Sequence, residues 1–459
     1  MERMGSLDAV FIAVEDAVNH MHIGSVGIFE GPAPTYSAVR ALVASKLQFV
    51  PRYRQRVREA PVSIGRPLWI DDARFDLDYH LRHTAIPTND PRGLEELVAR
   101  VMARPLDRHR PLWEMWVVEG LTDDRWAIVS KVHHCMVDGI AGSDLLGVVM
   151  DARADTPLLP PEPWTPAPEP SRFDLARYTA DMALEAASTF VREVVGAFVH
   201  PSRTWNRVTE IAAGVGHMVY PARRGGSSLS GPIGPHRRWT RTRVSLDDIK
   251  TVRGAFGGTV NDVVLAAVTR GFRELLLARG EPVDRRTITT LIPVSMRTAD
   301  ARGRLDNRVS AVYARLPIGI DDPVEALAAI HAHMNDLKGS HEIDASAAIL
   351  GIEDFMPPVV AAALARAVVH AQEVVQTVAT NVPGPQTPLY VCGRRMLEAY
   401  PYVPIAGHIR IGVAIWSYCG DLYFGVTADW ESTRDLDRLA IGIDVGFEDL
   451  LKEAASATG

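Results

Sequence analysis

Apolar positions recur along much of the chain at intervals of three and four residues, the spacing of one helix face. Leu7, Val10, Phe11 and Val14 show it first, after a Ser6 that suits a helix cap. The spacing predicts a helix there and over each further stretch that repeats it. These stretches are 36–49, 93–102, 173–199, the residues after a capping Ser245, those opened by Asn261-Asp262, those after Asp322-Pro323, 345–375 with a break at Pro357-Pro358, and 436–450.

Other stretches are shorter and rich in β-branched and aromatic residues, which favours β-strands. They cover 23–29, 114–118, 126–132, 287–294, 308–316, 374–380, 408–418 and 422–429. The last two flank a Gly420-Asp421 turn, and this arrangement predicts a hairpin. Because strands and helices alternate in both halves, we expect an α/β fold with mixed layers.

A proline-rich run at 156–171 separates the two halves and predicts an extended linker. Linkers of this kind commonly join domains. We therefore expect an N-terminal domain at 1–155, a linker at 156–235 that is proline-rich and then helical and arginine-rich, and a C-terminal domain at 236–459. Between Pro201 and Arg243 the chain carries eight arginines and a single acidic residue, Glu210. This stretch has three readings: a solvated connector, a contact for CoA phosphates, or a contact for anionic lipid headgroups.

The bulk composition narrows the class of protein. A chain of 459 residues is comfortable for two domains, and its net charge of -7 argues against nucleic acid as the main partner. Its three cysteines form no metal or disulfide pattern, which suits a reducing cytoplasm. The N-terminus lacks the apolar core of a signal peptide, and no window approaches the roughly 20 apolar residues that span a bilayer. Any membrane contact is therefore expected to be peripheral.

Two adjacent histidines, His133 and His134, follow the strand at 126–132, and Asp138-Gly139 comes shortly after them. Imidazole titrates near neutral pH, so a histidine with an aspartate nearby suits general-base chemistry. The alternatives are a structural histidine and a metal ligand, although no His-x-x-x-His or Cys-x-x-Cys spacing supports a metal. Adjacent strand residues point to opposite faces, so only one histidine of the pair can face a given cleft.

The segment His133–Gly139 resembles the HHxxxDG signature of CoA-dependent and carrier-dependent acyltransferases. Three further segments, Pro111-Leu112-Trp113, Asn261-Asp262 and Asn381-Val382-Pro383-Gly384-Pro385, are similar to motifs of the bacterial wax ester synthase/diacylglycerol acyltransferase family, and of its actinobacterial triacylglycerol synthases in particular. The matches keep the family's order and cover essentially the whole chain. The resemblance implies two chloramphenicol-acetyltransferase-like domains with the active site at their interface.

The resemblance also implies a mechanism. His134, the second motif histidine, would act as general base on an acceptor hydroxyl, while His133 would face away from the channel. Asn261 would donate a hydrogen bond to the oxyanion of the tetrahedral intermediate. Both substrates can be present together, so no acyl-enzyme is needed and Cys135 is not expected to act as a nucleophile.

The remaining motif residues have implied roles in structure or binding. Asp138, next to Gly139 of the motif, would turn away from the cleft and pair with Arg297, or else with Arg308, to fix the elbow that carries the base. The resemblance places substrate contacts at Glu15, Trp113, Asn381, Pro383 and Gly384. His20 and His22 lie two apart at the start of a strand, and we favour polar packing over a metal pair for them.

The implied substrates are a long-chain acyl-CoA as co-substrate and either diacylglycerol or a long-chain fatty alcohol as acceptor, with no bound cofactor or metal. Since both acceptors are insoluble in water, we expect a cytoplasmic protein associated peripherally with membrane or lipid droplets. Two rivals remain on the same fold: a lipid-binding protein without activity, and an acyl-CoA hydrolase that uses water as the acceptor.

Overall fold

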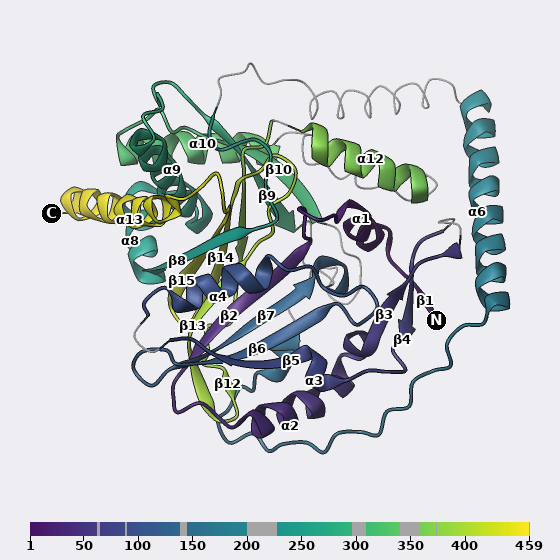
Figure 1. Ribbon diagram of the computed structural model, residues 1–459. Coiled ribbons are helices and arrows are strands. Elements are labelled where there is room, and N and C mark those ends of the chain that lie inside the picture. Colours follow the sequence, from purple (N-terminus) through teal and green to yellow (C-terminus); the bar gives the residue numbers. More distant parts are fainter. Residues whose placement is uncertain are drawn as a thin grey trace.

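The computed structural model describes residues 1–61, 65–87, 90–137, 145–199, 227–295, 309–339, 358–372 and 374–458. Two six-stranded sheets lie next to each other, and a three-stranded sheet flanks the first of them (Figure 1). Among the residues expected to matter, Asp138, Gly139, Arg297 and Arg308 lie outside the described ranges.

The N-terminal sheet has the strand order β12-β13-β2-β7-β6-β5. Its strands are β2 (His22–Phe29), β5 (Leu81–Ala85), β6 (Trp113–Glu119), β7 (Trp126–His133), β12 (Tyr390–Val391) and β13 (Arg394–Tyr402). Neighbours are antiparallel, except for the parallel pair β5 and β6. Every residue of the central strand β7 is buried, so its polar side chains must find their partners inside the protein.

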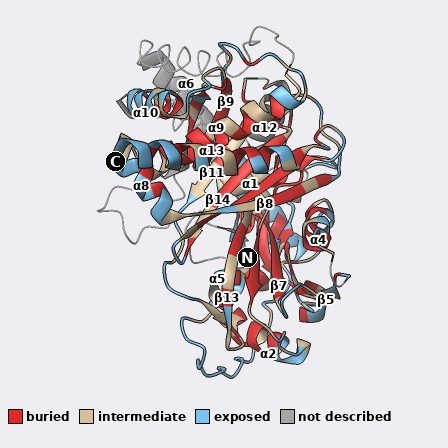
Figure 2. Ribbon diagram, turned by 90° about the vertical axis from the view of Figure 1, so that its left-hand side faces the viewer, coloured by how far each residue is buried: buried red, intermediate tan, exposed pale blue. Residues whose placement is uncertain are grey.

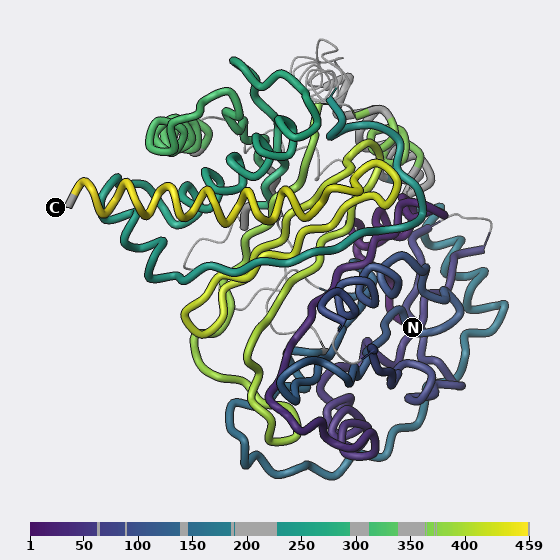
Figure 3. Tube along the Cα trace, turned by 60° about the vertical axis from the view of Figure 1, so that its left-hand side comes forward, coloured from purple at the N-terminus to yellow at the C-terminus, as the bar shows by residue number. Residues whose placement is uncertain are grey.

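Two strands of this sheet come from the far end of the chain. Figure 3 shows the segment that carries β12 and β13 beside β2, and the pairing aligns Met396 with Phe29 and Tyr402 with Gly24. This segment lies within residues 236–459, which the sequence assigns to the second domain. The division into 1–155, 156–235 and 236–459 therefore stays a prediction. The structure adds that β12 and β13, from the second half of the chain, complete the sheet of the first half.

The C-terminal sheet has the order β10-β9-β11-β14-β15-β8. Its strands are β8 (Arg237–Ser245), β9 (Ile288–Ser295), β10 (Val309–Leu316), β11 (Thr377–Val382), β14 (Ile411–Tyr418) and β15 (Asp421–Asp429). The last two form the predicted hairpin. Helices of this half are α8 (Leu246–Phe256), α9 (Val260–Ala278), α10 (Pro323–Gly339), α12 (Pro358–Ala371) and α13 (Leu436–Thr458).

Two helices of the C-terminal half, α9 and α13, approach each other closely because glycine lies at their crossing. A Cβ atom on Gly442 of α13 would come within 2.8 Å of the Cα of Gly271 on α9. Figure 2 shows the buried residues concentrated in the strands of both sheets, while the helices expose their outer sides. The close approach of α9 and α13 thus belongs to the packing that supports one side of the C-terminal sheet.

The remaining elements flank the N-terminal sheet. The small sheet pairs β1 (Glu2–Arg3) and β3 (Gln55–Arg58) with β4 (Leu68–Asp71). The helices are α1 (Ser6–Val14), α2 (Tyr36–Lys46), α3 (Leu77–His80), α4 (Gly93–Met102), α5 (Leu145–Val149) and α6 (Arg172–Val199). Residues 156–171 contain no helix or strand, as predicted, and α6 after them stands at the edge of the molecule (Figure 1).

One local prediction is wrong. Ser6 is the first residue of α1 and not its cap; Gly5 precedes the helix and no side chain caps it. The end of the arginine-rich stretch, for which three readings were open, lies on β8 from Arg237 to Arg243. Arg237 is 2% exposed, and Arg241 bonds to Glu398 at 3.1 Å. Both guanidinium groups are thus occupied by contacts within the protein and are unsuited to CoA or lipid.

Candidate active site

The backbone of the histidine pair is held from two sides. β7 ends at His133, and a short 3-10 turn, η4 (His134–Met136), begins at His134. The N–H of His133 donates to the carbonyl of Leu112 at 2.9 Å, whereas the N–H of His134 donates to the carbonyl of Met21 at 2.8 Å. Leu112 immediately precedes β6 and Met21 immediately precedes β2, so the pair is fixed between the two neighbours of β7. The side chains therefore point to opposite sides, as the sequence predicts.

The His133 side chain is fully buried and already engaged. Its Nδ1 accepts a hydrogen bond from the N–H of Cys135 at 3.2 Å, which caps η4. Its Nε2 lies 3.6 Å from Oε1 of Glu15. Burial lowers the pKa of His133 to about 3, against the opposing effect of the Glu15 charge. At neutral pH the ring is thus neutral, and its position suits a support better than a proton carrier.

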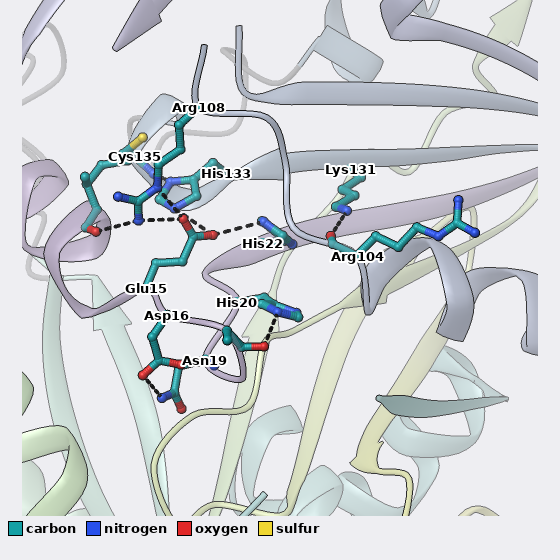
Figure 4. A network of polar contacts seen from close by, with 12 residues as sticks. Glu15, Asp16, Asn19, His20, His22, Arg104, Arg108, Lys131, His133 and Cys135 are labelled. Atoms are coloured by element: carbon teal, nitrogen blue, oxygen red, sulfur yellow. Dashed lines mark hydrogen bonds and ion pairs between the residues drawn. The ribbon is translucent and has the colours of Figure 1, made fainter. Parts of the chain in front are cut away.

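Glu15 is the centre of this buried cluster (Figure 4). It follows α1 directly, and its Oε2 accepts hydrogen bonds from the guanidinium of Arg108 at 2.7 and 3.0 Å. Its Oε1 lies 3.2 Å from Nε2 of His22, whose pKa burial holds well below the ordinary value. Arg108 also donates to the carbonyl of Ile12 at 2.9 Å, near the end of α1. The carboxylate therefore joins α1, β2 and β7, with Arg108 compensating its charge.

More polar groups extend the cluster along the same face of the sheet. The ring of His20 stacks on that of His22 with centroids 5.5 Å apart, and its Nε2 lies 3.0 Å from the carbonyl of Ala17. Lys131 points from β7 to the carbonyls of Val101 and Arg104 at the end of α4, and burial lowers its pKa to about 8. Among the described residues, no group of three or more histidine, cysteine or acidic side chains is placed to hold a metal ion.

His134 has a different environment. Its ring stacks on Phe11 of α1, with centroids 3.9 Å apart and planes inclined by 26°. Nδ1 is buried and, within the described residues, has no hydrogen-bond partner. Burial lowers the pKa of His134, and the backbone carbonyl of the same residue partly opposes this shift. This carbonyl is thus close enough to act on the ring, although it does not form a hydrogen bond of good geometry with it.

Cys135 lies between the histidines and the buried core, with 4% of its surface exposed. Burial raises the pKa of its thiol well above 9, and the charges of Asp8 and Glu15 act in the same direction. The nucleophilic form of a cysteine is the thiolate, which this environment disfavours strongly. The geometry therefore agrees with a mechanism that does not use Cys135 as a nucleophile.

The other candidate residues fall into separate groups. Trp113 is 1% exposed; its Nε1 donates to the carbonyl of Tyr53 at 2.9 Å and its ring stacks on His80 at 4.6 Å. Trp113 is thus a core anchor under the histidine strand, and a direct contact with substrate stays a prediction. Asn381 donates to Oδ1 of Asn261 at 3.3 Å, which links β11 to the start of α9.

The Asn261–Asn381 pair links α9 to β11 of the C-terminal sheet, whereas His133 belongs to β7 of the N-terminal sheet. Asn381 aligns with Ile415 in β14, next to the segment where Gly384 donates to Ser417 at 3.0 Å. Tyr418, at the end of β14, donates to the carbonyl of Met396, and Met396 aligns with the last residue of β2. His133, in contrast, aligns with the first residue of β2. The predicted roles of Asn261, Asn381, Pro383 and Gly384 therefore stay predictions.

Sequence reasoning missed Arg108, Lys131 and the use of His22 in the cluster. A signal was present for two of them, because His22 and Lys131 are polar residues on buried strands. They share one sheet face with His133, since His22 aligns with His133 and Gly24 with Lys131. A polar side chain on a buried strand needs an internal partner, and here that partner is either Glu15 or the end of α4. Arg108 lies in a loop, where the sequence gives no such signal.

Comparison with solved structures identifies the fold. The starter condensation domain of rhizomide synthetase covers 100% of this chain and 95% of its own, with a TM-score of 0.56 at 14% identity. A wax ester synthase/diacylglycerol acyltransferase from Marinobacter aquaeolei covers 99% of this chain and 100% of its own, with a TM-score of 0.72 at 23% identity. The predicted fold class is therefore confirmed.

Sequence comparison then identifies the family. Residues 4–264 match the wax ester synthase/diacylglycerol acyltransferase catalytic domain, and residues 305–451 match the C-terminal domain of the same enzymes. A probable diacylglycerol O-acyltransferase of Mycobacterium tuberculosis is 39% identical over 457 residues, which cover 97% of this chain and 94% of that protein. The chain belongs to the wax ester synthase/diacylglycerol acyltransferase family. The predicted enzyme class, an O-acyltransferase of the diacylglycerol and wax ester type, is thereby confirmed.

Within the ranges that the structure describes, no helix is both long and apolar enough to cross a bilayer.

Proposed function

We propose that the protein transfers a long-chain acyl group from acyl-CoA to the hydroxyl of diacylglycerol or a long-chain alcohol, with His134 as the general base. The observation that carries this assignment is the difference between the two histidines. His133 is fully buried, caps η4 and lies against Glu15, whereas His134 is a partly exposed residue whose ring contacts Phe11 and has no described hydrogen-bond partner at Nδ1. Of the pair, His134 is the ring that remains available to a substrate.

The chemistry follows from the neutral ring. Burial lowers the pKa of His134, so at neutral pH the imidazole is unprotonated and able to accept a proton. Nδ1 is the buried nitrogen of this ring, so Nε2 is proposed as the basic atom. Nε2 takes the hydroxyl proton while the alcohol oxygen forms a bond to the thioester carbon. As the tetrahedral intermediate collapses, the carbon–sulfur bond breaks and the proton passes from His134 to the CoA sulfur.

Other residues complete the proposal. The oxyanion requires a fixed hydrogen-bond donor, and the side-chain amide of Asn261 is our candidate. Asp138 and Arg297 form the proposed structural pair behind the motif, with Gly139 in the turn that follows. Glu15 holds His133 and His22 in place, and Asn381, Pro383 and Gly384 are proposed to line the acceptor path.

The acyl donor is proposed to be a CoA thioester. In support, the starter condensation domain that shares this fold is known in complex with C8-CoA and Leu-SNAC. The donor is a substrate, and the proposed reaction uses no resident metal or cofactor.

An assay of acceptor-dependent CoA release tests the function directly. Purified protein incubated with palmitoyl-CoA is expected to release free CoA only when diacylglycerol or hexadecanol is added, with the matching ester as product. Release that is the same without an acceptor would show a hydrolase. No release with either acceptor, together with saturable binding of the lipid, would show a lipid-binding protein. A His134→Ala variant is the control for contaminating activity.

We also propose that the protein works at a membrane or lipid-droplet surface, because both acceptors are insoluble in water. Arg237 and Arg241 are engaged inside the protein, so the contact must use other residues. Flotation with liposomes that contain anionic lipid and diacylglycerol is expected to carry the protein to the top fraction. Its recovery in the bottom fraction at both low and high salt would contradict a surface location.

A further inference from the structure

The loop of residues 15–21, which we call the base loop, joins α1 to β2, and its second half is buried although it carries polar residues. Asn19, His20 and Met21 are 1%, 4% and 7% exposed. The Asp16 carboxylate accepts hydrogen bonds from the backbone N–H groups of Val18 and Asn19, both at 2.8 Å, and from the Asn19 amide at 2.7 Å (Figure 4). These contacts give the loop one defined shape.

The base loop supports the proposed base through the backbone. The carbonyl of Met21, its last residue, accepts the hydrogen bond from the N–H of His134 at 2.8 Å. Glu15, its first residue, lies against His133. A shift of the loop therefore moves both histidines and, with them, the ring that takes the proton.

The loop is in turn fastened to the C-terminal sheet at two points. The N–H of Gly407, in the connection from β13 to β14, donates to Oδ1 of Asn19 at 2.7 Å. The guanidinium of Arg237, the first residue of β8, donates to the carbonyls of Val18, Gly234 and His236. Arg237 is 2% exposed, so its charge is buried at the junction between the two sheets.

We propose that Arg237 and Asn19 are positioning residues: they transmit the position of the C-terminal sheet through the base loop to His134. The buried guanidinium donates hydrogen bonds to backbone carbonyls of two separate segments and therefore holds them at a fixed distance. Asn19 has the complementary part, because its side chain bonds to Asp16 within the loop and to Gly407 outside it. The inference rests on the proposed function only in taking His134 as the base.

The chain offers a matched control on the same strand. Arg241 also reaches from β8 to the N-terminal sheet, where it bonds to Glu398 at 3.1 Å and lies 3.8 Å from Glu95 of α4. Among the described residues, Arg241 contacts Glu398, Glu95 and Tyr400, none of which belongs to the base loop. Arg241→Met therefore removes a charged contact between the sheets without touching the support of His134.

The kinetics of these variants distinguish a specific effect on the position of His134 from a general weakening of the contact between the two sheets. Arg237→Met and Asn19→Ala are each expected to lower kcat about 10- to 100-fold with little change in KM for acyl-CoA, because a misplaced base slows the chemical step. Arg241→Met is expected to keep kcat close to that of the unchanged protein. Arg237→Lys, which retains a donor, is expected to recover part of the loss. The double variant is expected to fall short of the product of the single effects, since both act through one loop.

A readout that does not depend on turnover distinguishes this inference from the proposed function. The rate at which diethyl pyrocarbonate modifies His134, measured by peptide mass spectrometry, is expected to change in Arg237→Met and not in Arg241→Met. Equal rates in all three proteins, or equal losses of kcat in the two arginine variants, would overturn the inference. Full activity of His134→Ala would instead overturn the proposed base, whatever the modification rates. If Arg237→Met does not fold, Asn19→Ala and Arg237→Lys carry the same comparison.

Discussion

Replacing His134 by alanine is expected to lower kcat by about 10²- to 10⁴-fold, the range that a positioned general base contributes. The protein should stay folded, because the ring is only partly buried and its described contact is the stacking on Phe11. KM for acyl-CoA should change little, since the base acts on the acceptor hydroxyl in the transition state. Steady-state kinetics with saturating acceptor provide the measurement.

His133→Ala is the matched comparison. Here the expected loss is mainly in stability, because the variant removes the cap of η4 and leaves Glu15 and His22 beside a cavity. Its thermal midpoint should fall below that of His134→Ala, while its kcat at a temperature where it is folded should exceed that of His134→Ala. Equal kcat values for two folded variants would contradict the assignment of the base.

The free energy of unfolding is expected to fall as the pH decreases from 7.5 to 5.5. Within the described part of the chain, burial lowers the pKa of five histidines: that of His80 to about 4, that of His133 to about 3, and those of His20, His22 and His134 below the ordinary value. In the folded protein these rings take up protons at a lower pH than in the unfolded chain, where protonation begins at a pH of about 6.5. The unfolded state therefore binds more protons as the pH falls, and stability decreases.

The expected change in the free energy of unfolding can be calculated for a single histidine. A histidine with a strongly lowered pKa costs about 1.4 kcal/mol of stability between pH 7.5 and 5.5. Glu95 acts in the opposite direction, because burial raises its pKa to about 7 and its stabilising contribution is therefore lost as the pH rises. The five histidines together are expected to outweigh it.

Urea unfolding of the unchanged protein and of His80→Asn at both pH values checks this. Nδ1 of His80 lies 2.8 Å from the carbonyl of Trp113, and an asparagine amide can donate there without titrating. The variant should therefore lose about 1.4 kcal/mol less than the unchanged protein between the two pH values. Identical pH dependence of the two proteins would show that His80 titrates normally in the folded state.

The sequence predicted those parts of the structure in which local pattern and tertiary environment agree. The helix at 93–102 and the hairpin of β14 and β15 are confirmed, since an amphipathic face or a turn between two apolar runs identifies each locally. The strand before the histidine pair and the opposite directions of the two rings also followed from local arguments. Family resemblance predicts a substrate contact for Glu15; the structure places its carboxylate against His133, and the substrate contact stays a prediction.

The sequence missed features that depend on contacts between distant segments. β13 is rich in polar residues and contains Pro401, which argues against a strand. The proline is tolerated because β13 pairs with β2 on one side, while β12 pairs only with its first residues. The sequence left open whether the arginines of β8 are solvated. A long arginine side chain can be buried if its guanidinium bonds to carbonyls or carboxylates, and here these partners come from distant segments of the chain.

The pairing of β13 with β2 fixes an order of events during synthesis of the chain. Strands β2, β7, β6 and β5 leave the ribosome early, but the edge of β2 stays open until residue 402 has been made. An unpaired edge beside a buried strand invites pairing with another chain. The histidine pair therefore lies on a sheet that is completed only when most of the second half has emerged. Nascent chains must keep that edge protected for the longer part of their synthesis.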